Sequence, residues 1–355
     1  MSFNKNKIIG ICLILICCFF GYYQFISKPY FSIIVSSYNY GHYLPQTIES
    51  ILNSTYQNFE LIIVNDGSTD KTSLYLKKYK NHPKMTIIEQ ENQGLSISRN
   101  NAMKIARGKF FWFVDADDWI DKKALETLYH KTRNTQLDLV SFFTGRVNEK
   151  GVFTGVGGYD RFPTILQENP KKTFNVYNLG VNELFSYPVT SGKQIYRRAF
   201  VEKHGIKFPP KTLFEDDVFF FHSIFSEANI STVPKVLYYK RAHGKAITSD
   251  KAKHFDSYLR ICQEIVKRTS KNKNQIEKAY SLSDYYVKGI PARWGTLSNE
   301  RKYKFYPELE KMKQYVEENA PKDPYWNRTK EWFDAFFESE NVRPYKEKIE
   351  KEESI

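Results

Sequence analysis

The sequence has little cysteine, and three of its four cysteines, Cys12, Cys17 and Cys18, lie in one apolar run near the N-terminus. Cys262 alone lies outside this run, so the chain has neither a disulfide framework nor a cysteine cluster for zinc. A Gly-x-x-x-x-Gly-Lys loop is also absent, which argues against a P-loop kinase. The sequence shows no zinc-finger pattern, RNP motif or internal repeat. These absences leave a globular chain without obvious nucleic-acid chemistry.

Positive charge is in excess, with 53 Lys and Arg against 40 Asp and Glu among 355 residues, a formal net charge of +13. The lysines are scattered along the chain, so we interpret them as a solvated basic face near a membrane, with no nucleic-acid partner. The hydrophobic content of 41% is enough for a sizeable core and excludes a disordered chain. The length suits one large domain with an appendage, or two domains.

The N-terminal apolar run extends over residues 8–26 without a charge and is long enough to span a bilayer as one helix. The residues around its C-terminal end, Phe25 to Pro29, offer no small-residue site for cleavage of a signal peptide. We therefore predict a single uncleaved membrane anchor over residues 1–28.

Buried strands and helices alternate after Pro29, which predicts a Rossmann-like, mostly parallel α/β sheet flanked by helices. The right-handed crossovers of such a sheet place the carboxyl ends of its strands along one rim. The expected strands are 31–36, 61–66, 85–89 and 110–114, and the expected helices are 44–53, 71–80 and 94–106.

Three carboxylates follow the apolar run Phe110–Val114 directly, at Asp115, Asp117 and Asp118. Ligands of open α/β sheets bind outside the carboxyl ends of the strands, where these acids are expected. Clustered carboxylates repel one another, and Mg²⁺ or Mn²⁺ relieves the repulsion. The competing interpretation is a strand end that turns into solvent, with Asp118 or Asp121 capping the next helix.

A second acidic group, Glu215-Asp216-Asp217, is set between aromatic residues. Burial among aromatic rings raises the pKa of a carboxyl group and makes it a better general base. The competing interpretation is a helix N-terminus that carries favourable acids.

Four segments resemble the family 2 glycosyltransferases, which are nucleotide-sugar enzymes of the GT-A fold. The segments are Ile33–Asn39, Glu60–Asp70, Asn92–Gly94 with Ser98–Asn100, and Val114–Asp118, and they follow one another at the spacing of the family. The resemblance implies a catalytic domain over residues 29–250.

The family roles, carried onto this sequence, imply a donor site, a metal site and a general base. Tyr38 would stack on the donor base or simply pack, Asp66 would bind uracil or ribose or else cap a helix, and Arg99 would contact phosphate or an aspartate of the rim. Asp118 would support the metal. The donor-binding residues implied are Ser37, Tyr38, Asn39, Asp66, Arg99, Asp115, Arg241 and Lys245; the Mn²⁺ or Mg²⁺ ligands are Asp117 and His243; the base is Asp216, with Glu215 and Asp217 as substitutes.

The resemblance implies an inverting hexosyl- or N-acetylhexosaminyltransferase of cell-surface polysaccharide synthesis, with a UDP-sugar donor and a glycan or lipid-linked acceptor. Two lysines precede the apolar run and one follows it, which favours a catalytic domain on the outer side of the membrane. The activated sugar donor is cytosolic, however, so we predict that the catalytic domain is cytoplasmic. A nucleotidyltransferase and a catalytically silent, membrane-tethered binding protein are the alternatives.

Residues 251–355 lie beyond the resemblance, and their periodicity predicts a C-terminal helical region. We expect helices over 255–268, 275–287 and 307–318, with Pro307 in the first turn of the last. The aromatic residues Trp326, Trp332, Phe333, Phe336 and Phe337 suggest an amphipathic helix that docks on the core, or alternatively on a membrane.

Overall fold

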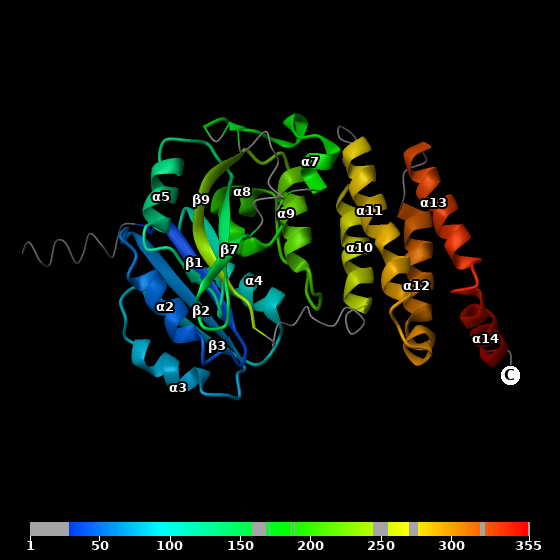
Figure 1. Cartoon of the computed structure of the whole chain (residues 1–355), viewed down its shortest axis with the longest axis horizontal. Helices are drawn as coiled ribbons and strands as arrows, with labels where there is room; N and C mark the ends of the chain where they lie inside the picture. The colour runs from blue at the N-terminus through cyan, green and yellow to red at the C-terminus, as the bar shows by residue number, and fades with distance from the viewer. Residues whose placement is uncertain are drawn as a thin grey trace, which may run out of the picture.

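A computed structural model describes residues 28–157, 168–169, 171–185, 187, 189–243, 255–269, 276–319 and 324–353. A body built on a β-sheet lies beside a group of C-terminal helices (Figure 1). The predicted anchor lies outside the described residues except for Lys28, and no described helix is both long and apolar enough to cross a membrane.

One nine-stranded sheet forms the centre of the body. Its hydrogen-bonded order is β3-β2-β1-β4-β8-β6-β9-β5, and β7 pairs with β6 off this path. The strands are β1 (Phe31–Ser37), β2 (Phe59–Asp66), β3 (Met85–Gln90), β4 (Phe110–Asp115), β5 (Trp119–Ile120), β6 (Leu139–Val147), β7 (Phe153–Gly157), β8 (Gln194–Arg197) and β9 (Ile230–Arg241).

The first four strands pair in parallel, as predicted. In their register Ser36 lies opposite Asp115, and Ser37 lies opposite Asn65, the residue before Asp66. The strand ends that carry the predicted donor and metal residues therefore meet at one rim.

The rest of the sheet is mixed, so the predicted parallel arrangement holds for the first four strands and does not extend to the whole sheet. Strand β8 pairs antiparallel with both β4 and β6, and β5 pairs antiparallel with β9. Strands β6 and β9 run parallel to each other. Each antiparallel pair includes a strand after residue 118, where β7 follows β6 directly and where β5 and β8 are short, with two and four residues.

Helices cover both faces of the sheet because its strands are buried on both sides. Helices α2 and α5 pack on one face, and α4, α8 and α9 pack on the other, where the core continues into the C-terminal helices. The helices are α2 (Leu44–Leu52), α3 (Thr72–Leu76), α4 (Leu95–Ile105), α5 (Ala124–Thr132), α7 (Val181–Phe185), α8 (Arg198–Lys203), α9 (Glu215–Phe225), α10 (Phe255–Thr269), α11 (Ile276–Trp294), α12 (Asn299–Asn319), α13 (Pro324–Phe337) and α14 (Arg343–Glu353). The helix predicted over 71–80 is split, since a 3₁₀ turn over Lys77–Tyr79 follows α3.

The C-terminal helical region forms as predicted, with one error of placement. Helix α12 begins at Asn299, so Pro307 lies inside it rather than in its first turn. In α13, Phe333 and Phe337 are buried in the same hydrophobic core as α9, and Trp332 and Phe336 pack against that core. Core packing is therefore confirmed for these four aromatic residues.

Candidate active site

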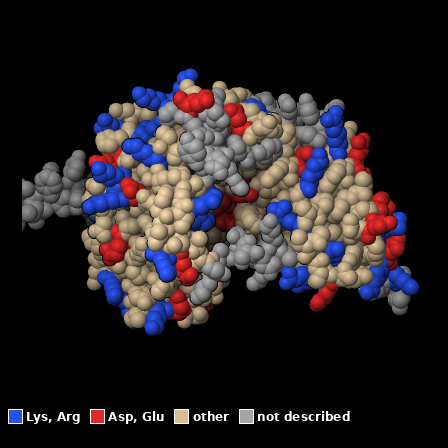
Figure 2. Space-filling view, in the orientation of Figure 1, with Lys and Arg blue, Asp and Glu red and all other residues tan. Residues whose placement is uncertain are grey.

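A cavity of about 510 Å³ lies at the carboxyl ends of the parallel strands. Figure 2 shows a hollow between the sheet body and the C-terminal helices, with acidic side chains at its floor and Lys or Arg side chains at its edges. Several polar residues expected at the site line the cavity, namely Ser37, Tyr38, Asp66, Asp115, Asp117, Arg241 and His243. The volume is in the range of about 300–1,000 Å³ that is usual for small-ligand pockets.

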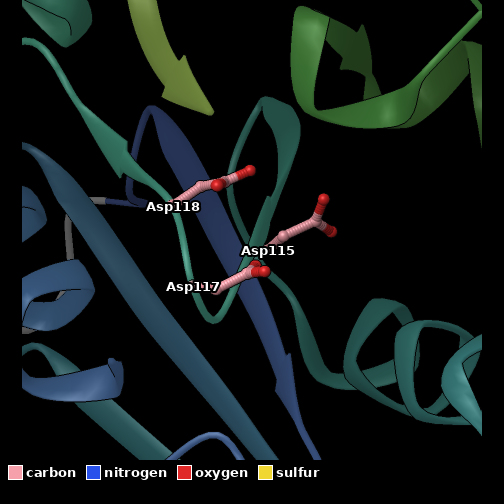
Figure 3. A group of neighbouring side chains, drawn as sticks. All are labelled: Asp115, Asp117 and Asp118. Atoms are coloured by element: carbon pink, nitrogen blue, oxygen red, sulfur yellow. The ribbon is translucent and has the colours of Figure 1, made fainter. Parts of the chain in front are cut away.

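The three aspartates after β4 gather as the sequence predicted (Figure 3), with one ligand oxygen of each within 4.8 Å of the others. Burial and the nearby Asp115 raise the pKa of Asp117. Burial, Asp117 and Asp115 raise the pKa of Asp118 well above its ordinary value. The cluster thus holds negative charge that a cation would stabilise.

The three carboxylates are not equivalent as ligands. Both oxygens of Asp118 already accept hydrogen bonds, from the Tyr238 hydroxyl at 2.6 Å and from the Arg241 backbone N–H at 2.8 Å. Asp118 thus joins β9 to the loop after β4. It does not cap the next helix, α5, whose N-terminus at Lys123 has no side-chain cap.

Asp117 points towards His243, whose Nε2 lies 2.6 Å from Asp117 Oδ2. The sequence placed these two residues together as metal ligands although 126 positions separate them. Carboxylate oxygens and an imidazole nitrogen are hard and borderline donors that suit Mn²⁺ or Mg²⁺. The carboxylate cluster of Asp115, Asp117 and Asp118 and the imidazole beside Asp117 are donors of the kind such an ion takes, although both oxygens of Asp118 also bond to the chain.

Arg99, on α4, links the rim of β4 to the start of α9. Its guanidinium donates to Asp115 at 3.0 Å, to Glu215 at 2.7 Å and to Asp216 at 2.7 Å. The side chain is almost completely buried and stacks over the Phe208 ring at 5.0 Å. Although its own burial lowers the pKa of Arg99, Asp216, Glu215 and Asp115 outweigh that effect and raise it. The sequence left either a phosphate or an aspartate of the rim as the partner of Arg99, and the structure shows the contact with the rim aspartate, Asp115.

The first turn of α9 separates its three acids. Burial and Asp216 raise the pKa of Glu215 to about 8, and burial raises that of Asp217 to about 7 in spite of a hydrogen bond from Tyr286. Asp216 is the most accessible of the acids that Arg99 holds at this helix, with 17% of its side chain exposed against 5% for Glu215. The acids therefore begin a helix, as one interpretation expected, and burial raises the pKa of Glu215 and Asp217, as the other expected; the role of general base stays a prediction.

Asp66 and Asn39 hold the loops that form the rim. Asp66 accepts hydrogen bonds at 2.8 Å from the Gln90 side chain and from the backbone N–H groups of Gln93 and Gly94. It therefore shapes the loop before α4 and does not cap α3. Asn39 accepts a hydrogen bond from Thr69 N at 2.8 Å, so its side chain ties two loops together, and Asn39 is not among the residues that line the cavity.

Three buried hydroxyls in the cavity wall, those of Ser36, Ser37 and Ser96, lack hydrogen-bond partners among the described residues. Ser37 is 1% exposed and Ser96 is 3% exposed. A buried hydroxyl without a partner costs free energy, so these atoms are suited to a ligand or to water. Tyr38 is 46% exposed at the same wall.

Of the two basic side chains predicted to bind the donor near its diphosphate, Arg241 is described and Lys245 is not. Arg241 is largely taken up by the chain, because it donates to Asp117 O at 3.1 Å and to Glu149 O at 2.9 Å and stacks on Tyr43 and Trp119. Lys245 lies outside the described residues.

Sequence reasoning missed Lys240 and Ser96, which both line the cavity. Desolvation lowers the pKa of Lys240, but Asp115, Asp118 and Asp117 outweigh it and raise the pKa. Lys240 directly precedes Arg241, and Ser96 lies two residues after Gly94. Closeness in sequence to residues of the predicted site was therefore the only signal that could have pointed to them.

Comparisons with known proteins agree with this geometry. A family model described as Glycosyl transferase family 2 matches residues 32–202. EpsH of Bacillus subtilis, named as a glycosyltransferase, is 31% identical over 266 residues, which are 73% of this chain and 74% of EpsH. The poly(ribitol-phosphate) beta-N-acetylglucosaminyltransferase TarP of Staphylococcus aureus is 27% identical over 217 residues, 59% of this chain and 61% of TarP.

Solved structures show the same fold. S. aureus TarS in complex with UDP aligns with a TM-score of 0.63 at 21% identity and covers 90% of this chain and 91% of that one. Its complex with UDP-GlcNAc aligns over the same shares with a TM-score of 0.61 at 22% identity. The chain therefore belongs to glycosyl transferase family 2, and its sheet body has the GT-A fold.

Proposed function

We propose that this glycosyltransferase moves a hexose or N-acetylhexosamine from a UDP-sugar to a hydroxyl of a glycan or lipid-linked acceptor, with inversion at the anomeric carbon. The cavity beside Asp66 and Ser37 has the size and polar lining of a nucleotide site. Structures of similar fold contain UDP and UDP-GlcNAc, which supports UDP as the donor nucleotide. TarP is named for polymer glycosylation and supports a role in cell-surface polysaccharide synthesis.

The observation that carries this proposal is the Arg99 network. It joins Asp115, at the donor rim, to Asp216, which is 101 positions further along the chain, through two contacts of 3.0 and 2.7 Å. A nucleotide bound at the rim would therefore be next to a carboxylate that is held in a set orientation. A silent binding protein would not require this connection.

Asp216 is the best general base of the three acids. At neutral pH a carboxyl group with a pKa of about 8, such as Glu215, is largely protonated, and Asp217 is about half protonated. Asp216 takes the proton of the acceptor hydroxyl, and the hydroxyl oxygen then forms a bond to the anomeric carbon. The bond from that carbon to the diphosphate breaks on the opposite face, so the configuration inverts.

Asp117, Asp115 and His243 would hold a divalent ion, which supplies charge neutralisation for a diphosphate leaving group when it is bound. Lys240, in the same cavity, adds a fixed positive charge that stabilises the negative charge developing on the leaving oxygen. Asp66, Ser37 and Ser96 would orient the donor base and ribose, and Arg241 would hold the wall near the diphosphate. Anchoring by residues 1–28, with the catalytic domain on the cytoplasmic side, belongs to the same proposal.

The test is release of UDP by the full chain in nanodiscs, screened over UDP-GlcNAc, UDP-glucose and UDP-galactose with Mn²⁺ or Mg²⁺. Asp216→Asn should lower kcat by about 10²–10⁴-fold and leave donor affinity unchanged, because it removes only the base. Asp256→Asn, which neutralises an acid on α10, is the matched control and should keep its rate.

Two results would contradict the proposal. Full activity of Asp216→Asn would exclude Asp216 as the base, and a loss in Asp217→Asn instead would move the role to that residue. Absence of UDP release and of binding for every UDP-sugar would overturn the proposed donor. Release of pyrophosphate from a nucleoside triphosphate would indicate a nucleotidyltransferase.

A further inference from the structure

A second cavity, of about 710 Å³, lies between the sheet body and the C-terminal helices. Helix α9 forms one wall, and helices α10 and α11 form the other, and these helices lie side by side in Figure 1. The residues that line it include Phe214, Asp217, Phe221, Tyr258, Tyr285 and Lys288. None of them belongs to the donor cavity described above.

The first turn of α9 serves the base and this second cavity together. Asp216 is held by Arg99, and the next residue, Asp217, lines the second cavity and accepts a hydrogen bond from Tyr286 of α11. Consecutive helical residues project about 100° apart, so the two acids point to neighbouring sectors around one helix end. A molecule in the second cavity therefore lies against the helix turn that carries the proposed base.

The charged groups of the second cavity are already paired within the chain. Lys288 contacts Asp284 at 2.8 Å, and Asp284 also accepts a hydrogen bond from Thr329 at 3.0 Å. The guanidinium of Arg293 lies 3.5 Å from the centre of the Tyr258 ring. These contacts hold both cations within the chain and leave little net charge to attract a phosphate or a nucleotide.

Aromatic rings supply most of the remaining lining. Tyr187 and Phe221 are buried in the wall, whereas Tyr285 is 60% exposed and stands at the mouth. A sugar ring has an apolar face of C–H groups and a rim of hydroxyls, so it packs on aromatic rings while its hydroxyls bond to carboxylates and to tyrosine O–H groups. A charge-balanced cavity rich in tyrosine suits this chemistry better than that of an ion.

We propose that this cavity binds a neutral saccharide of the acceptor, the sugar next to the one whose hydroxyl reacts at Asp216. The proposal rests on the proposed glycosyl transfer, and it names the acceptor class as uncharged at this neighbouring sugar. It also explains why α11, outside the matched family region, contributes side chains to the wall of the catalytic helix.

The experiment measures binding of chitotetraose, cellotetraose and maltotetraose, with tetragalacturonate as the anionic probe, to the full chain in nanodiscs by saturation-transfer NMR. At least one neutral probe should bind. Tyr285→Ala should weaken that binding about tenfold, and Tyr285→Phe should stay within about twofold because the ring is kept. Tyr75→Ala, which removes a tyrosine of α3 on the far side of the sheet body, is the matched control and should bind as the wild type does.

Donor binding separates this inference from the proposed function. UDP-GlcNAc titrated into the same samples should bind wild type and Tyr285→Ala equally. Saccharide binding without donor binding would overturn the UDP-sugar proposal and leave the cavity assignment standing. Failure of every neutral probe, equal binding by Tyr285→Ala, or preference for tetragalacturonate would overturn the assignment.

Discussion

Replacement of Arg99 by Met tests the central network of the site most directly. The substitution keeps the aliphatic volume that packs against Phe208 and removes the positive charge shared by three carboxylates. Removal of one partner from a buried ion pair costs about 3–5 kcal/mol, since the other charge stays buried without compensation. Glu215, with 5% of its side chain exposed and a pKa of about 8, avoids part of this cost by binding a proton, and Asp115, with 27% exposed, can be rehydrated. We therefore expect a loss of about 3 kcal/mol at pH 8, the lower end of the range for one buried pair.

The loss should depend on pH in a defined direction. Without the guanidinium, the pKa of buried Glu215, which is already raised, rises further in the folded variant, so the variant binds protons more strongly when folded than when unfolded. Its stability relative to the wild type is then best in acid and falls as pH rises. Urea unfolding at pH 5 and pH 8, followed by fluorescence of the buried Trp112, measures this difference.

Arg197→Met is the matched control for Arg99→Met. Arg197 also pairs with a partly buried carboxylate, Asp138 at 3.3 Å, but it lies away from both cavities. It should lower stability and leave kcat for UDP release unchanged, whereas Arg99→Met should lower both. A loss below about 1 kcal/mol in Arg99→Met, or a loss equal at pH 5 and pH 8, would refute the reasoning.

Three further predictions concern single groups of the site. Tyr238→Phe removes the hydroxyl that donates to buried Asp118, so the free energy of unfolding in urea should fall by about 1–3 kcal/mol. An unchanged free energy of unfolding would show that this hydrogen bond does not stabilise the fold. Gly67→Ala should cost about 1–3 kcal/mol in the same assay, because Gly67 has φ +72° and an added Cβ would lie 2.7 Å from Asn92 N; an unchanged midpoint would contradict this strain. The pKa of Glu215 is raised, so its protonation stabilises the fold fully below pH 4.5, and this contribution is lost as pH rises through about 8. Wild type should therefore lose stability relative to Glu215→Gln over that range, and parallel pH profiles would exclude the raised pKa.

Local patterns were sufficient for the first half of the fold. Apolar runs such as Phe110–Val114 between turn residues favour buried strands, and the helices between them favour right-handed parallel crossovers. Parallel strands end at the same edge, which is why Asp66 and Asp115 could be placed at one rim from the sequence. Asp117 and His243 were paired through the family resemblance, and the structure brings them within 2.6 Å.

Side-chain direction was beyond the sequence wherever several partners were possible. Asn39 and Arg241 occur in the expected loops, but each side chain satisfies backbone groups of its own chain, because loop atoms without partners would otherwise cost free energy. The antiparallel half of the sheet also depends on which distant strand covers each edge, and short segments such as β8 carry no such information.

The sequence by itself determined the parallel half of the sheet, the acidic ends of its strands and the family, because these follow from residue periodicity and local motif order. The tertiary structure alone decided that Arg99 joins Asp115 to Asp216, that Asp118 is committed to Tyr238, and that α11 forms a second cavity with α9. These features depend on contacts between residues 16 to 120 positions apart, and the energy of such contacts exists only when both partners are brought together and removed from water.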